Sequence, residues 1–206
     1  RIKTYGTSLQ ADWQLGESNF LITGYEFVQD QLEADTDARS SMSMRSMLMS
    51  DTQTHRFNKG KETTNAIFAS METSLPMDFT VNYGVRYTWV NSKLSKASAS
   101  LNGFDRNGQY KNFDDGSAGK TGSDRNSRPV FNLSLNWTGL PDTSLRAGWS
   151  QGFRVPNLQE KYLMNSMGGG TIFGNPNLKP EKSNNFEIGA RYAGSAVEAD
   201  FALFYN

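Results

Sequence analysis

A methionine-rich segment in the first third of the chain offers soft metal ligands. It places Met42, Met44, Met47 and Met49 within eight residues of one another. Thioether sulfurs suit Cu(I), which makes the segment a candidate copper site. Methionine also packs adaptably against large apolar ligands, and the alternation of these residues fits an extended strand equally well.

The chain has a single histidine, His55, a few residues after the methionines. Imidazole is a common metal ligand, so His55 joins the methionines as a candidate ligand, although a lone loop histidine is more often simply solvated. Cysteine is absent, which excludes disulfides and cysteine-based zinc sites.

Two proline-containing segments, about 20 residues apart, frame a second candidate site. Arg154 lies in the first, and its guanidinium is suited to a propionate or to the carboxylate of a chelate. Proline ends strand pairing and Asn-Pro forms turns, so the two segments fit a conformational role equally well. The residues between them include Tyr162, Met164 and Met167. The segments themselves are Phe153-Arg154-Val155-Pro156 and Asn175-Pro176-Asn177-Leu178.

Composition argues against several other classes. The 21 basic residues balance the 21 acidic ones, which gives no reason to expect a nucleic-acid partner. The sequence contains no Ser-His-Asp set, no phosphate-binding loop and no paired catalytic carboxylates, so an enzyme is not predicted. No run of about 18 apolar residues exists to form a transmembrane helix.

The strongest pattern is the alternation of apolar and polar residues with a period of two, which predicts eight strands in four hairpins. One face of each run is apolar and aromatic, and the other is polar. The runs are Tyr5–Leu15, Leu21–Phe27, Ile67–Leu75, Phe79–Trp89, Phe131–Trp137, Leu145–Trp149, Phe186–Tyr192 and Val197–Tyr205.

The connections between the runs are of two kinds. Those at 16–18, 76–78, 139–143 and 193–196 are a few residues long, whereas those at 30–62, 95–128 and 154–183 are about 30 residues long. Outer-membrane barrels have short periplasmic turns and long extracellular loops, and the long loops are where such barrels bind their ligands. We therefore expect the long connections to lie together at one rim.

Two features favour a transmembrane barrel over a soluble β-sandwich. Aromatic residues gather near the ends of the runs, as in interfacial girdles. The polar faces carry full charges, as a wet lumen would: Asp12, Glu72, Arg86, Arg146, Glu187, Arg191, Glu198 and Asp200.

The last 60 residues resemble the TonB-dependent outer-membrane receptors. Residues 149–162 are similar to the family's strand-to-loop segment, and residues 174–183 followed by 186–192 are similar to the segment that enters the next strand. Gly84-Val85-Arg86-Tyr87 resembles the same family more weakly. The resemblance implies an all-β, antiparallel transmembrane barrel of about 22 strands. It implies that residues 1–206 are a partial β-barrel domain that supplies eight of those strands, without the plug domain and the closing strands.

The resemblance also implies a function. The family lies in the bacterial outer membrane, contacts its lipid, and imports an iron chelate, a ferric siderophore or haem, with energy from the TonB complex coupled through the plug. The two proline segments resemble those of the haem receptor branch, whose ligating histidine lies between them; residues 157–174 contain no histidine, and Val155 replaces the usual alanine. No intrinsic cofactor is expected. The predicted ligand-binding residues are Arg154, Tyr162, Phe153, Asn175 and Asn177, and the predicted metal ligands are His55 and the four methionines.

Three alternatives remain open at this stage. The same receptor family could import copper. A non-transporting structural or adhesive barrel of eight strands would instead close its first strand on its last. A soluble β-sandwich would bury the apolar faces against each other in pairs.

Overall fold

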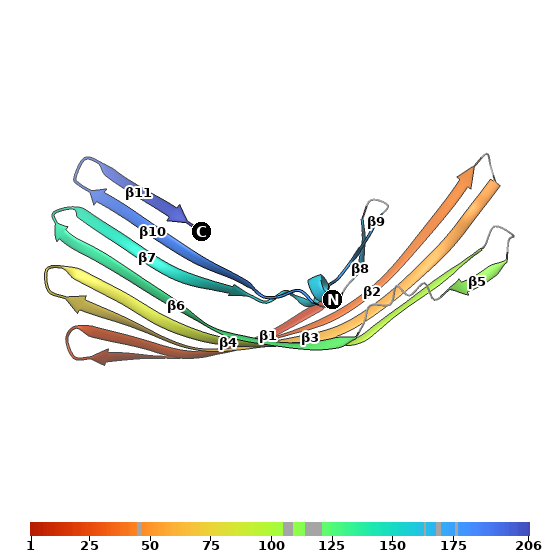
Figure 1. Cartoon of the computed structure of the whole chain (residues 1–206), viewed down its shortest axis with the longest axis horizontal. Coiled ribbons are helices and arrows are strands. Elements are labelled where there is room, and N and C mark those ends of the chain that lie inside the picture. The colour runs from red at the N-terminus through yellow and green to blue at the C-terminus, as the bar shows by residue number, and fades with distance from the viewer. Residues whose placement is uncertain (45–46, 105–108, 114–120, 163, 168–169, 176) are drawn as a thin grey trace.

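The computed structural model describes residues 1–44, 47–104, 109–113, 121–162, 164–167, 170–175 and 177–206. The eight long strands form one antiparallel sheet in the order β1-β2-β3-β4-β6-β7-β10-β11; β5 pairs with β4, and β8 and β9 form a separate hairpin (Figure 1). The elements are β1 (Ile2–Leu15), β2 (Asn19–Met44), β3 (Met47–Leu75), β4 (Phe79–Phe104), β5 (Tyr110–Phe113), β6 (Gly122–Leu140), β7 (Thr143–Arg154), α1 (Leu158–Tyr162), β8 (Met164–Met167), β9 (Gly170–Phe173), β10 (Glu181–Ala193) and β11 (Glu198–Tyr205).

The eight predicted strands and their four tight hairpins are confirmed in order. All four turns gather at one end of the sheet, on the left of Figure 1. Three of them use left-handed backbone, at Gly16 (φ 72°), at Met77 and Asp78 (φ 64° and 62°), and at Asp142 (φ 55°). Glycine and aspartate both tolerate this region. We call this end of the sheet the turn end, and the opposite end the loop end.

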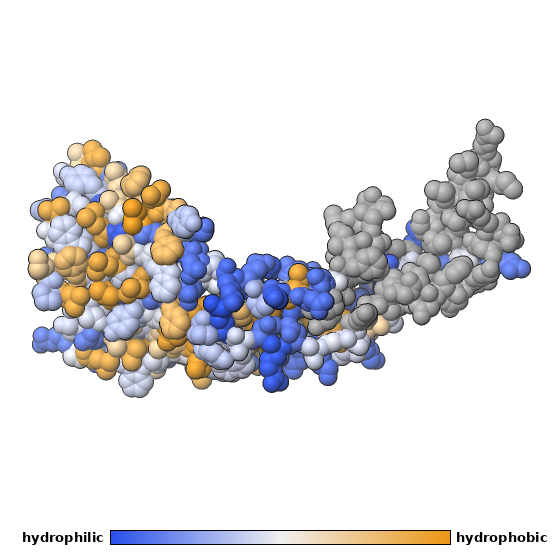
Figure 2. Space-filling view, viewed as in Figure 1, coloured by the Kyte–Doolittle hydropathy of each residue, from blue (hydrophilic) through white to orange (hydrophobic). Residues whose placement is uncertain are grey.

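The pairing register assigns the side chains to two faces. The outer face of the turn end carries large apolar side chains that are well exposed, among them Leu9, Tyr83, Leu133, Ile188 and Phe201. The inner face of the turn end carries mostly polar and charged residues. Figure 2 shows the apolar turn end and the more hydrophilic middle of the molecule. This exposure suits a surface that meets lipid.

Most of the first two long connections is paired strand, so the expectation of irregular loops at 30–62 and 95–128 is wrong over much of their length. β2 and β3 remain paired to their ends at Met44 and Met47, and β4 runs to Phe104 against β3, β5 and β6. The alternation fades because the outer face of these extensions is polar and the inner face is apolar only beneath α1, whereas backbone pairing needs no apolar face.

The third connection folds back onto the sheet. It forms α1 and the β8–β9 hairpin, which the alternation did not predict. Leu158 of α1 packs with Leu32 of β2 and Leu94 of β4 in a small buried cluster on the inner face. In the part of the chain that the structure describes, no helix is long and apolar enough to cross a membrane.

Candidate functional site

Arg154 is held between two carboxylates at the loop end of β7. Its guanidinium donates two hydrogen bonds to Glu160 of α1, at 3.1 and 3.0 Å, and two to Glu181 of β10, at 3.1 and 2.7 Å. Glu181 is its cross-strand partner in the ladder. Arg154 therefore joins two strands and the helix at one point, with both edges of the guanidinium in use.

These ion pairs shift the pKa values of the three groups. The hydrogen bonds from Arg154 lower the pKa of Glu160 and that of Glu181 below their ordinary value. The two carboxylates in turn raise the pKa of Arg154, Glu181 contributing the most. The Arg154 side chain stays 51% exposed, so water screens much of this interaction.

Glu160 also closes the first turn of α1. Its carboxylate accepts a hydrogen bond from the backbone N–H of Asn157 at 2.9 Å, and its own N–H donates to the Asn157 side-chain oxygen at 2.9 Å. This reciprocal pair is a capping box, which satisfies backbone donors that the helix start leaves free. One carboxylate thus caps the helix and fixes Arg154.

The second proline segment is tied to the same helix. The backbone N–H of Asn175 donates to the Glu160 carbonyl oxygen at 3.0 Å. The Asn175 side chain then accepts from the N–H of Asn177 at 3.0 Å, which forms a local turn. Both segments therefore meet at Glu160, although about 20 residues separate them in sequence.

α1 lies against the inner face through its buried side. Leu158 is 6% exposed and sits over Gly60 of β3, where an added Cβ would lie 2.9 Å from the leucine Cδ1. Glycine at position 60 thus permits the close approach of the helix. Pro156, at the start of the loop, is also buried.

Lys161 anchors the other side of α1. Its side chain is 0% exposed and forms an ion pair with Asp124 of β6. The carboxylate of Glu62 lies nearby and accepts a hydrogen bond from Ser92 at 2.6 Å. Burial lowers the pKa of Lys161, and Glu62 opposes this shift. A buried amine that is paired in this way holds the helix in place, because separating it from Asp124 would leave a charge without its partner.

The predicted ligand residues are not all brought together. Phe153 precedes Arg154 in β7, so its side chain lies on the outer face while that of Arg154 lies on the inner face. Tyr162 ends α1, and its side chain lies outside the described part of the structure. Asn175 and Asn177 are exposed beside the helix. Ligand binding by the five residues stays a prediction.

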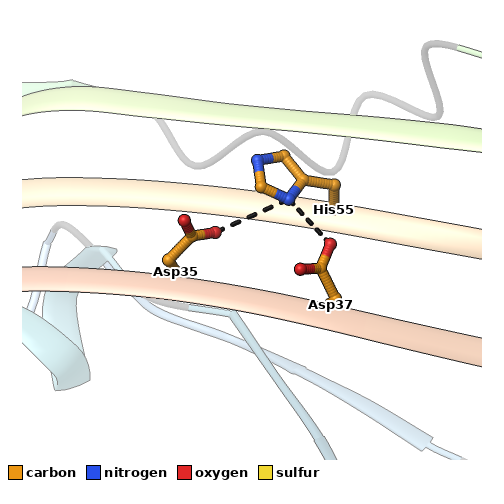
Figure 3. A group of neighbouring side chains, drawn as sticks. All are labelled: Asp35, Asp37 and His55. Atoms are coloured by element: carbon orange, nitrogen blue, oxygen red, sulfur yellow. Dashed lines mark hydrogen bonds and ion pairs between the residues drawn. The ribbon is translucent and has the colours of Figure 1, made fainter.

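His55 lies on the outer face of the loop end with two aspartates (Figure 3). Its Nδ1 is 2.8 Å from an Asp37 carboxylate oxygen and 3.5 Å from one of Asp35, and all three residues are exposed. The hydrogen bond to Asp37 raises the pKa of His55. Ligands bound at about 2.0–2.1 Å around a tetrahedral metal lie about 3.3 Å apart. The three ligand atoms all lie within 4.8 Å of one another, so small side-chain shifts would let one divalent transition metal bind all three.

The two aspartates were missed from sequence. Asp35 and Asp37 are two residues apart in β2, which places both on one face, and the hairpin register sets His55 opposite Asp37. The spacing of the aspartates was visible, but the register over this polar extension was not. Of the predicted methionines, Met42 and Met44 lie in β2, and Met47 and Met49 in β3; their side chains lie outside the described part of the structure.

Several of the charged residues predicted for the inner face form ion pairs between strands at the turn end. Arg86 is 2.5 Å from Glu26, and Arg146 is 2.8 Å from Glu187 and 2.9 Å from Asp200. Their exposures of 35–48% indicate a wet surface, as a lumen wall requires.

Comparison with known proteins gives one family match over nearly the whole chain. A family described as "TonB dependent receptor-like, beta-barrel" matches residues 2–206. A Vibrio cholerae protein named "Iron-regulated outer membrane virulence protein" is 41% identical over 80 residues, which is 37% of this chain and 11% of that protein. The chain thus spans about a tenth of the length of this curated relative.

Solved structures share the fold at low sequence identity. The ferric yersiniabactin uptake receptor FyuA from Yersinia pestis matches 98% of this chain and 28% of its own, with a TM-score of 0.58 and 18% identity. The copper transporter OprC matches 98% of this chain and 29% of its own, with a TM-score of 0.68 and 14% identity. At these identities the likeness concerns the fold alone.

Proposed function

The chain belongs to the TonB-dependent receptors by its β-barrel region, and from this premise we propose that the full-length protein takes up an iron chelate across the outer membrane. The chelate, a ferric siderophore or haem, docks on the loop end. Energy from the TonB complex then acts through a plug domain, as is usual for the family.

One observation carries the proposal. The sheet forms a wall with an apolar outer face and an ion-paired inner face, and at its loop end the two proline segments both contact Glu160. Such a wall separates lipid from a wet interior and holds a shaped surface above it. The name of the Vibrio cholerae relative, with its reference to iron, supports iron as the cargo.

The contacts of Arg154 suggest how the site recognises its ligand. Because Glu160 and Glu181 occupy the guanidinium, Arg154 first fixes the position of α1 and of the second segment. A chelate carboxylate would have to share the guanidinium or displace a glutamate. We therefore propose that Asn175, Asn177 and Tyr162 meet the ligand from a surface that Arg154 holds in place.

Copper uptake is the second candidate function. The observation in its favour is the β2–β3 hairpin, which carries Met42, Met44, Met47 and Met49 together with His55 and its two aspartates. Thioethers and imidazole suit copper better than they suit a ferric chelate, whose metal is already enclosed.

Binding to the full-length receptor in detergent tests both candidates. We expect saturable binding of haemin, with a Soret shift, or of one ferric siderophore from a panel, and weaker binding by Arg154→Ala than by Arg154→Lys. Arg191→Ala, which removes a guanidinium from the turn end, is the matched control and should bind normally. Tight binding of copper without any chelate would overturn the iron proposal.

Absence of binding, together with unimpaired growth of a receptor-deletion strain on every chelate tested, would favour the structural or adhesive alternative.

A further inference from the structure

A row of lysines crosses four strands on the outer face at the start of the loop end. In the ladder, Lys3 of β1 faces Gln31 of β2, Gln31 faces Lys61 of β3, and Lys61 faces Lys93 of β4. In the next row, Lys59 of β3 faces Lys96 of β4. All five lysines are exposed, and we call them the lysine patch.

The patch lies directly beyond the outer-face aromatic residues. Tyr5 is two residues from Lys3 along β1, and Trp89 is four residues from Lys93 along β4, in each case toward the turn end and on the same face. Tyr87 and Trp89 lie side by side, with ring centroids 5.9 Å apart. Aromatic rings of this kind occupy the level of lipid headgroups. The lysines therefore stand at that level or just outside it.

The arrangement of the lysines is electrostatically unfavourable by itself. Lys61 and Lys93 are direct cross-strand neighbours, as are Lys59 and Lys96, and like charges in such pairs repel. Among the described residues, no ion pair involves any of the five. The inner face differs, because Arg86 and Arg146 there are paired with carboxylates.

The patch also lines a hollow of strongly positive character. Arg1, Lys3, Lys59, Lys61 and Lys93 line it, and Glu33 is its one acidic residue. Glu33 faces Lys59 across the β2–β3 ladder and offsets one charge. A ligand with more than one negative charge would remove the remaining repulsion.

We propose that the lysine patch binds the phosphate-bearing headgroup of a lipid in the leaflet on the loop side of the membrane. The long side chains run along the apolar surface while their amines reach the headgroup level. Lysine binds phosphate as a point charge, and each lysine near an anionic surface contributes about a fivefold gain in affinity. A lipid suits the site because the acyl chains fall on the exposed apolar side chains below the patch.

The inference rests on the membrane-spanning wall of the proposed receptor but not on its cargo. The experiment uses the full-length receptor in mild detergent, with bound lipids counted by native mass spectrometry. The probes are lipid A, which carries two phosphates, phosphatidylcholine, and inorganic phosphate. The variant is Lys61→Gln/Lys93→Gln. Arg128→Gln/Arg191→Gln removes the same charge from the inner face of β6 and β10 and serves as the matched control.

We expect the wild type to retain lipid A in preference to phosphatidylcholine. The Lys61→Gln/Lys93→Gln variant should bind lipid A roughly 10- to 100-fold more weakly, and the control variant should bind it as the wild type does. Equal binding by wild type and patch variant, or an equal loss in the control, would overturn the proposal. So would competition by millimolar inorganic phosphate, because the site would then take a free anion and not a lipid.

Chelate binding by the same samples separates the two proposals. A receptor that binds no chelate but loses lipid A in the patch variant would refute the proposed function and leave the lipid site standing. Normal chelate binding without any lipid preference would do the reverse.

Discussion

The turn end and the loop end of this sheet carry their apolar residues on opposite faces. Along β4, Tyr83 and Val85 of the turn end point outward and are 46% and 39% exposed, whereas Val90 and Leu94 beyond them point inward and are 6% and 1% exposed. In β2, Leu32 of the loop end is likewise buried on the inner face, whereas Leu21 and Phe27, on the outer face of the turn end, are only partly buried.

This inversion marks the level at which the surroundings of the outer face change from lipid to water. At the turn end the apolar medium lies outside, so the outer face is apolar and the inner face carries ion pairs. At the loop end water lies outside, and the helix α1 supplies the apolar contact on the inner face. The strands do not change their pairing at this boundary; only the chemistry of their two faces changes.

Removal of a buried loop-end side chain gives the largest expected effect. Leu94→Ala leaves a cavity beneath α1 and should lower the free energy of unfolding by about 2–5 kcal/mol. Urea unfolding of the full-length receptor in lipid vesicles measures this. Leu133→Ala, on the outer face of the turn end, is the matched control, with an expected loss of about 1 kcal/mol. Equal losses at both positions would mean that the loop end has no core of its own.

A charge placed on the outer face tests whether the turn end meets lipid there. Leu133→Arg puts a guanidinium where we expect lipid, and it should destabilise the folded state by about 2–4 kcal/mol. Ser127→Arg, farther along the same face of β6 and opposite Trp89, should cost about 0–1 kcal/mol. The same unfolding assay compares them. If the Leu133→Arg variant were as stable as the Ser127→Arg variant, the lipid boundary would be in the wrong place.

The loop end should respond to acid more than the turn end. The pKa values of Glu160 and Glu181 are lowered in the folded state from an ordinary value of 4.5. Their contribution is therefore complete above pH 4.5 and is lost as the pH falls below it, through the folded-state pKa values. Hydrogen exchange of residues 157–162 should accelerate over this range, and Glu160→Gln should show fast exchange already at pH 7.

If the hydrogen exchange of residues 157–162 in the Glu160→Gln variant still accelerated with acid, the ion pair between Glu160 and Arg154 would not be what stabilises α1.

The smallest effect is expected at His55. Because Asp37 raises its pKa above 6.5, the ion pair stabilises the hairpin below that pH and is lost as the pH rises through the folded-state pKa. A metal would compete with the proton, so zinc or nickel binding should strengthen from pH 6 to pH 8. Calorimetry on the receptor and on His55→Ala measures this, with Asp12→Asn at the turn end as the control. Unchanged binding in His55→Ala would place the metal elsewhere.

The strands of the turn end could be predicted from the sequence, because lipid outside and water inside impose an alternation of apolar and polar residues on them. The prediction failed at the loop end, where Lys59 and Lys61 fall in a predicted loop although they are paired strand. α1 and its capping box at Asn157 and Glu160 were not predicted, because the five residues of the helix are too few to show a helical period.

The candidate sites depended on contacts between distant segments. The two proline segments, which contain Arg154 and Asn175, were identified from the sequence. That they meet at Glu160, and that Glu181 supplies a second carboxylate to Arg154, could be seen only in the folded structure. His55 was identified without its aspartates for the same reason: the register of a polar hairpin is not fixed by hydrophobic pattern.

The inversion itself can be measured directly, because a chain without cysteine accepts single labels. Spin labels at successive positions of β4, from 81 to 97, would report access to oxygen and to a water-soluble nickel complex in bilayers. We predict that odd positions from 81 to 87 meet lipid, that position 91 lies at the headgroup level, and that position 94 is shielded from both reagents. Lipid access that continues at the odd positions beyond 91, or at position 94, would contradict the account.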